Sequence, residues 1–504
     1  MNIQQRKRFI RTFYFVVFSL ILITFFRHSY ADEPPFSSKE FVDSVIGENR
    51  SVEEKLKIID VFQSTGEPLD VNNAYRLIKY IPLADKKLTS SLLEFIREAS
   101  VRGCPIESAV VSKELSPLMD EYIENHEYDR FRYLLSVLEW VYQNDASVED
   151  KNIFLYSDLL LFTYLKKYDY KLLEYYLDEH PTELPDVASF PDFSVGEEVA
   201  DYYLHKLDKN LPSFTAKLLR YINENDLIYF IRENDINIFV GITDVQTDKT
   251  EMRTIGRDIL SKITHQKDIS NWKEWWENNN KDLNITQTAL KTLVDKKVDD
   301  AEKRFTIRQL GYSFFLSKAD IEIIRALESI IEDSMSTLDI RCRSFQTLIF
   351  IYVNYVDNIG TENFNEEVYK FLFDSIVRCV TDFLIKNAQV HDLLTILPGE
   401  IVNVRNVKTK IMAILNNTSM NRRSRGAAAY ALGFSKTDKK NVGESILNFL
   451  KEDLPGREPD TTNNRTVLGL MSLTRNKSFS FNLEEWRKAV SEIPDDPPEE
   501  NLSK

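Results

Sequence analysis

The sequence predicts an all-α protein, an α-solenoid of stacked helical hairpins. Glycine and proline are scarce, at 14 and 16 of 504 residues, whereas turn-rich all-β folds need many of both. Apolar residues recur at helical spacing, as in the stripe Leu134, Val137, Leu138 and Val141. Polar breaks such as Asn144-Asp145 interrupt the helical runs, and this alternation is typical of helical hairpins.

The first residues have the pattern of an export signal. Residues 1–11 contain four basic and no acidic residues, residues 12–26 are an apolar run, and Ser29-Tyr30-Ala31 has small residues at its first and third positions. This order is typical of a secretory signal peptide, which we expect to span 1–31. The run is shorter than the roughly 20 residues that a spanning helix needs. The alternative is an uncleaved membrane anchor formed by 12–26.

The charge of the chain limits its partners. Its net charge is −15, and cleavage after Ala31 would remove five basic residues and no acidic ones, leaving −20. A body this acidic repels phosphate backbones and anionic membrane surfaces, so we exclude nucleic acid and, after cleavage, membrane binding. We expect an exported protein that is periplasmic or secreted.

Composition shifts divide the chain. We expect the segment 32–39 to be a flexible lead and 40–180 to be an irregular helical N-terminal domain. The segment 181–196 holds three prolines and one glycine, so it is the expected linker. A helical repeat domain should follow over 197–492. The last segment, 493–504, is acidic and proline-rich, which predicts a disordered tail.

One repeat unit is clear, over 421–450. Its first helix begins with Arg422, Arg423 and Arg425 and continues through small residues that let two helices approach closely. Gly433 should end this helix in the left-handed conformation, and Asp438 should cap the next one. The pattern R-x-x-A-A-x-A-L-G, a short loop and a second amphipathic helix resembles a HEAT repeat.

Weaker starts of the same kind occur near Arg253, Arg304, Arg343 and Arg465. The segments 253–276 and 465–486 each have Arg-Thr, an apolar helix, a polar loop and then tryptophan in a new helix. This arrangement resembles extracytoplasmic HEAT-repeat proteins, in which a Leu-Thr-Gly helix end precedes a W-x-x-W-W helix. The resemblance covers about 250–490 and implies a solenoid with a long concave surface.

Three groups of side chains are candidates for contact with a partner. The aromatic group on one predicted helix face is Trp272, Trp275 and Trp276. A tyrosine-rich stretch contributes Tyr168, Tyr170 and Tyr175. The basic group is Arg422, Arg423 and Arg425. For each group packing is the alternative: tryptophans closing a groove between helices, tyrosines lining the seams between hairpins, and arginines lying across a neighbouring repeat.

The sequence offers little for catalysis. The chain has three cysteines, an odd number, and none of them forms a CxxC pair. Cys342 and Cys379 are either buried thiols or a bridge between neighbouring helices. No catalytic residue, metal site or cofactor is predicted, because no nucleophile, base or ligand set emerges. We expect an exported scaffold that binds a protein or peptide. The alternative is a periplasmic glycan-binding or glycan-processing helical protein that uses the tyrosine-rich half.

Overall fold

The computed structural model describes residues 37–494 except 146, 149–154, 169, 186–192, 209, 245–249, 317–319, 357–363, 455–459 and 476–480. Every regular element in these residues is a helix, and none of them forms a strand, which confirms the predicted all-α class. The chain divides into two compact units, Met1–Pro185 and Asp186–Lys504. The division falls inside the segment 181–196, which contains the 3-10 helix η2 (Pro181–Glu183) and the start of α10 at Phe193.

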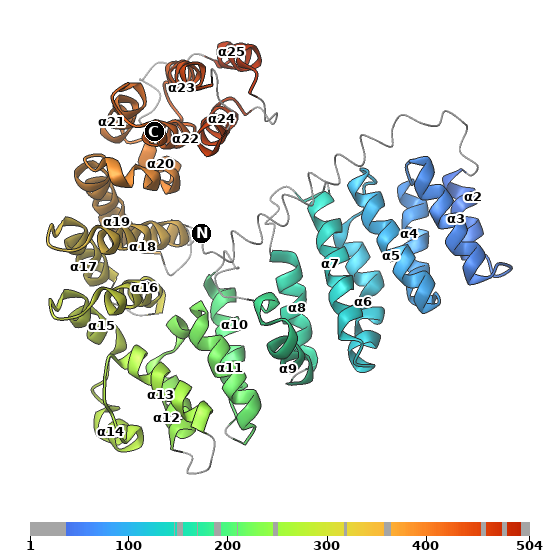
Figure 1. The fold of residues 1–504 in the computed structure, drawn as a ribbon, viewed down its shortest axis with the longest axis horizontal. Coiled ribbons are helices and arrows are strands. Elements are labelled where there is room, and N and C mark those ends of the chain that lie inside the picture. The colour runs from blue at the N-terminus through green and yellow to red at the C-terminus, as the bar shows by residue number, and fades with distance from the viewer. Residues whose placement is uncertain are drawn as a thin grey trace. The chain divides into compact units, whose positions relative to one another are not determined.

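The first unit is a stack of helical hairpins (Figure 1). The two helices of a hairpin pack on each other, as α2 does on α3, α4 on α5 and α6 on α7. Alternate helices also pack, so that α2 contacts α4, α4 contacts α6, α3 contacts α5 and α5 contacts α7. Two layers result, which is the solenoid arrangement. The helices are α2 (Ser38–Ile46), α3 (Val52–Thr65), α4 (Val71–Tyr80), η1 (Ile81–Leu83), α5 (Lys86–Val101), α6 (Ser108–Glu124), α7 (Tyr128–Asn144), α8 (Leu155–Tyr168) and α9 (Tyr170–Glu179).

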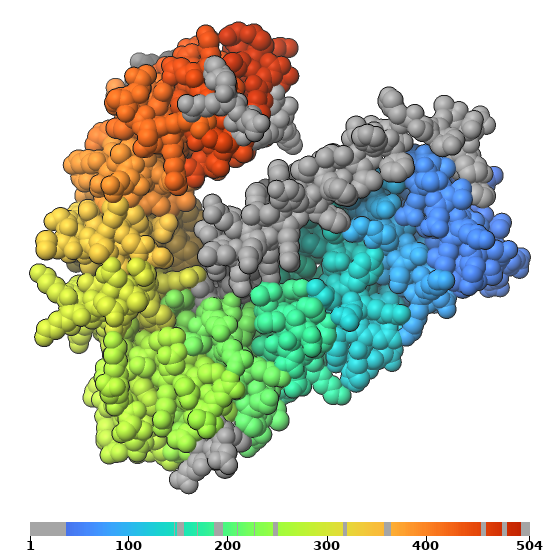
Figure 2. Space-filling view, in the orientation of Figure 1, coloured from blue at the N-terminus to red at the C-terminus, as the bar shows by residue number. Residues whose placement is uncertain are grey.

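Local sequence signals start these helices. Ser37 and Glu40 form a reciprocal capping box at the start of α2, and Ser51 and Glu54 form one at the start of α3. The helix α2 therefore begins at Ser38, inside the segment 32–39 that was expected to be a flexible lead. Figure 2 shows that side chains fill the spaces between successive helices.

The second unit continues the same kind of stacking. Its helices are α10 (Phe193–His205), α11 (Pro212–Glu224), η4 (Asp226–Phe230), η5 (Glu233–Asp235), α12 (Ile236–Thr243), α13 (Thr250–Thr264), α14 (Trp272–Asn279), α15 (Ile285–Val294), α16 (Asp300–Leu316), α17 (Asp320–Glu332), α18 (Leu338–Val356), α19 (Glu366–Cys379), the π-helix η6 (Val380–Leu384), the 3-10 helix η7 (Ala388–Ile396), α20 (Gly399–Val402), α21 (Arg405–Asn416), α22 (Arg422–Leu432), α23 (Lys439–Asp453), α24 (Thr461–Thr474) and α25 (Leu483–Ser491).

Two layers run through the C-terminal part of this unit. Layer A consists of α16, α18, η7, α22 and α24, which contact one another in that order. Layer B consists of α17, α19, α21, α23 and α25. In Figure 1, α16, α18 and α22 lie on one side of the unit, and α17 and α21 on the other. One hydrophobic core extends from Ala289 to Ile493 between the layers. Ile493, expected to open a disordered tail, is therefore packed.

The alanine-rich helix α22 packs closely, as the sequence predicts, but two predicted details are wrong. Gly433 adopts a right-handed φ of −57° and does not end the helix in the left-handed region. Asp438 is itself left-handed, with φ of 56°, and its side chain makes no capping bond to α23. Gly433 instead gives close access to α24, because an added Cβ would lie 2.5 Å from the Gly469 carbonyl oxygen.

An arginine is the fourth residue of three helices, α13, α18 and α22. The Nε atoms of Arg253, Arg341 and Arg425 each donate to a backbone carbonyl ten residues earlier, at 3.1, 2.7 and 2.7 Å respectively. Those carbonyls lie at the ends of preceding helices, where they lack partners in their own helix. The equivalent of Arg425 in α18 is thus Arg341, not the expected Arg343.

The predicted cysteine alternatives are resolved. Cys104, Cys342 and Cys379 are all free, so the Cys342–Cys379 bridge does not form. Cys379 is buried in the core, and Cys342 is half-buried and packs against the core, as expected of small apolar residues. Burial raises the pKa of both thiols, which keeps them protonated and unreactive near neutral pH.

Candidate functional site

Two of the three tryptophans of α14 are buried. Trp272 and Trp276 are buried, and Trp275 is half-buried with its ring edge-on to Trp272. The indole Nε1 of Trp276 donates to Asn237 of α12 at 2.5 Å. Trp272 and Trp276 thus help to hold α14 against α12, and only Trp275 of the three retains substantial surface for a partner.

Tyrosine hydroxyls join neighbouring hairpins in the first unit. Three residues of α6 stand four apart, on one face of the helix, and each meets a tyrosine of α8. Ser112 bonds to Tyr156, Ser116 to Tyr164 at 3.1 Å, and Asp120 accepts from Tyr168 at 2.7 Å. The α8 tyrosines therefore connect α8 to α6, a helix of the preceding hairpin. We call these three hydrogen bonds the α6–α8 rungs.

The other two candidate tyrosines belong to α9. Tyr175 donates to Asp129 of α7 at 2.8 Å, and its ring lies 4.8 Å from that of Tyr128. Burial, together with the hydrogen bond to a carboxylate, raises the pKa of Tyr168 and of Tyr175 to about 12. Tyr170 is half-buried. The three tyrosines belong to the first unit, whereas the tryptophans and arginines belong to the second. The role of the tyrosines in binding stays a prediction.

The three arginines of α22 reach different neighbours. Arg422 bonds to Asp453 of α23 and to Asp460 at the start of α24, and so joins three helices. Arg425 donates to the Leu415 carbonyl and to Glu452 at 2.8 Å. Arg423 pairs with Asp392 of η7.

Asp392 belongs to one of two clusters with the same composition, each a carboxylate between two arginines from different elements. Besides Arg423, Asp392 accepts from Arg465 of α24 at 2.7 Å.

The second cluster lies where α16 meets α18. Asp339 accepts from Arg304 of α16 at 2.7 Å and from Arg343 of its own helix at 3.1 Å. Burial acts to raise the pKa of both aspartates, but the guanidinium groups outweigh it and hold each pKa below its usual value. Both carboxylates are therefore charged at neutral pH, and each cluster carries one net positive charge.

A row of exposed apolar side chains follows layer A. Four successive parts of the layer each leave one large apolar residue in water: Val353 of α18, Ile396 of η7, Phe434 two residues past α22, and Leu468 of α24, which are 48%, 39%, 38% and 41% exposed. Within the described parts of the five layer B helices, no large apolar side chain is exposed to this degree; the exposed Met335 lies three residues past α17, in the connection to α18. We call these four residues the apolar row.

Sequence reasoning missed the apolar row and the two aspartates. Arg304, Arg343 and Arg465 were noted only as starts of repeats, and their pairing with Asp339 and Asp392 depends on how the helices stack. The signal in the sequence is an arginine near the start of one helix that faces an acidic residue of the neighbouring repeat. This signal identifies a particular pair of residues only when the repeat length is known, because the length sets which residues of neighbouring repeats face each other.

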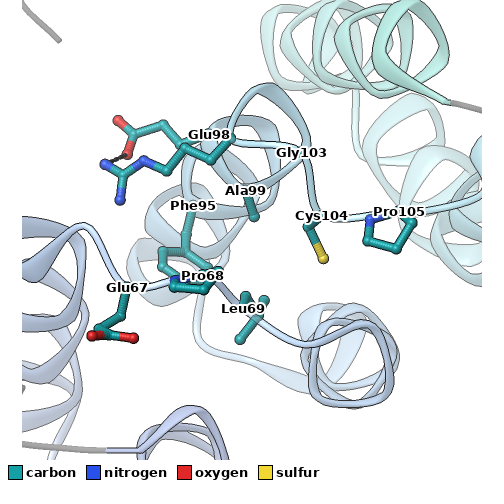
Figure 3. Close-up of a pocket in the computed structure, with 10 residues that line it drawn as sticks. Glu67, Pro68, Leu69, Phe95, Glu98, Ala99, Gly103, Cys104 and Pro105 are labelled. Carbon is teal, nitrogen blue, oxygen red and sulfur yellow. Dashed lines mark hydrogen bonds and ion pairs between the residues drawn. The ribbon is translucent and has the colours of Figure 1, made fainter. Parts of the chain in front are cut away.

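Each unit has a hollow on its surface. In the first unit, a cavity of about 180 Å³ lies between the α3–α4 connection and the end of α5. Figure 3 shows Pro68, Leu69 and Phe95 lining it together with Cys104 and Pro105. Burial raises the pKa of the Cys104 thiol to about 11, so the thiol is a poor nucleophile at neutral pH.

The second hollow, about 390 Å³, lies between α21 and α23. Arg425 and the buried Phe449 line it together with polar side chains: the half-buried Ser445 and the exposed Asn416, Asn448, Lys451 and Glu452. Its residues belong to layer B except for Arg425, whose guanidinium is 4.5 Å from the centre of the Phe449 ring.

The described ranges contain neither a metal cluster nor a membrane-spanning helix. In those ranges, no group of three or more His, Cys, Asp or Glu side chains is arranged to hold a metal ion. No helix there combines the length and apolar character needed to cross a bilayer. The predicted signal peptide and anchor residues, 1–31, lie outside the described residues.

Comparison with known proteins adds little to this geometry. The sequence matches no protein-family model and no curated protein sequence. Among solved structures, one similar chain comes from work on Tel2 structure and function in the Hsp90-dependent maturation of mTOR and ATR complexes. The match has 12% identity and a TM-score of 0.19, and it covers 89% of this chain and 98% of that one. The α-solenoid architecture rests on the stacked helices of this chain itself.

Proposed function

We propose that the chain is an exported scaffold that binds a protein or peptide partner through layer A of its second unit. The observation that carries this proposal is the unequal exposure of apolar side chains on the two layers. Single exposed apolar residues are common on any surface. Here one follows another on four successive parts of one layer, while the described helices of layer B expose none of comparable size.

A partner would gain free energy by covering this row. Burial of apolar surface is favourable by about 25 cal/mol per Å². Solenoids offer such rows because each repeat places an equivalent side chain beside the last one. The residues therefore supply a contact strip along the layer, and the helices behind it supply a rigid support.

The experiment is site-specific photo-crosslinking in the native host. A photo-reactive amino acid replaces Val353 or Leu468 in layer A, and matched variants carry it in place of Arg405 or Lys451, exposed residues of layer B. We expect one protein to be crosslinked at Val353 and Leu468 and not at Arg405 or Lys451. Crosslinks confined to layer B, or none at any position, would contradict the proposal.

Export is proposed on the N-terminal residues alone. A basic head, the apolar run 12–26 and a small-x-small exit support cleavage after Ala31. The intact mass of the protein isolated from its host should correspond to a chain that starts at Asp32. A chain that still starts at Met1 would contradict cleavage and favour the membrane anchor.

A further inference from the structure

The two layers differ in charge as well as in exposed apolar surface. The elements of layer A carry nine basic and four acidic residues, and α22 and α24 carry no acidic residue at all. Layer B carries 11 basic and 12 acidic residues. Three of the nine basic residues, Arg341, Arg422 and Arg425, bond to layer B helices. The other six still outnumber the four acidic residues, so layer A is net positive in a chain with a net charge of −15.

The basic charge lies beside the apolar row. Tyr430 follows Arg423 by seven residues of α22, about two helical turns, so these two side chains lie along one line of the helix. Phe434 follows two residues past the end of α22. In α24, Arg465 precedes Leu468 by less than one turn. Because Gly426 faces Thr462 and Gly433 faces Gly469, α22 and α24 run parallel. Their charges and apolar side chains therefore form neighbouring rows.

The arginines near these rows have capacity left for a ligand. Asp392 and Asp339 each divide their oxygens between two guanidinium groups, which have more donors than one carboxylate can accept. Exposure also leaves them within reach, since the side chains of Arg423 and Arg343 are 73% and 48% exposed. A carboxylate brought by a partner would complete the bonding and neutralise the excess charge of each cluster.

We propose that the segment bound by layer A is acidic and carries apolar side chains, so that its carboxylates meet the Asp339 and Asp392 clusters while its apolar side chains cover Val353, Phe434 and Leu468. This inference rests on the proposed function and names the chemistry of its partner. It runs against the net charge, which by itself would attract a basic partner. Charges close to the bound segment determine which peptide binds, because salt screens charges farther than about 8–10 Å away.

The test uses the full chain and three labelled peptides in a fluorescence anisotropy titration. The first is an amphipathic peptide of leucine and glutamate, the second has glutamine in place of glutamate, and the third has lysine. We expect the glutamate peptide to bind most tightly and to weaken with added salt, because its contacts are charge-assisted. Tightest binding by the lysine peptide, equal binding by all three, or no binding by any would overturn the proposal.

Three variants locate the contact. Arg423→Gln and Arg343→Gln should each weaken binding of the glutamate peptide about two- to fivefold, the range for exposed ion pairs. Arg405→Gln, the same change on α21 of layer B, should have no effect. Asp392→Asn removes a negative charge from layer A and should tighten binding, a gain that misfolding cannot imitate. Weaker binding by Asp392→Asn, or equal effects of Arg423→Gln and Arg405→Gln, would also overturn the proposal.

Failure of this inference can be told apart from failure of the proposed function. If crosslinking captures a partner at Val353 and Leu468 but the crosslinked segment is neutral or basic, layer A is the binding face and only the acidic chemistry is wrong. If the partner is captured only through layer B, the proposed function itself is wrong, whatever the peptides do.

Discussion

Gly433 of α22 and Gly469 of α24 face each other where the two helices come closest. An added Cβ on Gly433 would lie 2.5 Å from the Gly469 carbonyl oxygen, and one on Gly469 would lie 2.5 Å from the Ala429 carbonyl oxygen. Backbone atoms cannot move aside as the end of a flexible side chain can. The two glycines therefore fix the spacing between α22, which ends two residues before Phe434, and α24, which carries Leu468.

Gly433→Ala should lower the free energy of unfolding by about 1–3 kcal/mol, the usual cost of overpacking. Gly241→Ala is the matched control, because Gly241 is also helical, in α12, and an added Cβ meets nothing within 4 Å. That control should be neutral or stabilising by up to about 1 kcal/mol. Urea denaturation followed by circular dichroism measures both. Equal effects of the two substitutions would show that α22 and α24 are not in close contact.

Arg422 and Arg423 are neighbours in sequence but should differ in their effect on stability. Arg422→Gln leaves the buried carboxylate of Asp453 with Asn463 as its remaining side-chain partner and should cost about 1–3 kcal/mol. Arg423→Gln removes an exposed ion pair and should cost less than about 1 kcal/mol. Thermal denaturation of the two variants compares them directly. A larger loss for Arg423→Gln would contradict the assignment of Arg422 as the residue that joins α22, α23 and α24.

The sequence predicted the fold where signals are local. Apolar spacing and scarce glycine and proline indicated stacked helices, and small residues indicated the close approach of α22. The prediction failed where one residue admits two roles. Glycine at the end of a helix suits either a left-handed stop or a helix crossing, and for Gly433 only the position of Gly469 decides between them.

The candidate site was harder to predict for the same reason. The sequence singled out Arg422, Arg423 and Arg425 as one basic group, yet in the structure Arg423 reaches η7, whereas Arg422 and Arg425 both reach α23. Exposure of Phe434 or Leu468 depends on which side of α22 and α24 is covered by neighbours. The exposure of these residues is set by packing between repeats, and the spacing of residues within one helix does not reveal that packing.

The Tyr168 hydroxyl should stabilise the first unit. Tyr168→Phe removes its hydrogen bond to Asp120 and keeps the ring, so it should lower the free energy of unfolding by about 0.5–1.5 kcal/mol. Ultraviolet titration of the folded protein should also lose one tyrosine that ionises near pH 12. If Tyr168→Phe leaves stability unchanged, the α6–α8 rungs contribute nothing, and the ring face becomes the reason to keep a tyrosine there.

Acid should weaken the Asp392 cluster. The pKa of Asp392 is lowered in the folded chain, although burial opposes this, because Arg423 and Arg465 stabilise the charged form. Its stabilising contribution is therefore present above the unfolded pKa of about 4 and is lost as the pH falls through the lower folded value. The difference in unfolding free energy between the wild type and Asp392→Asn should be constant from pH 7 to about pH 5 and should shrink below about pH 4. A difference that grows in acid would have the wrong sign.

The most direct test of layer A as the binding face is hydrogen–deuterium exchange of the full chain, alone and with its crosslink-identified partner. Backbone amides of η7, α22 and α24 should exchange more slowly in the complex, because the partner covers their exposed side. Amides of α21 and α23 in layer B should be unchanged. Protection of α21 and α23 with no change in η7, α22 and α24 would contradict the account.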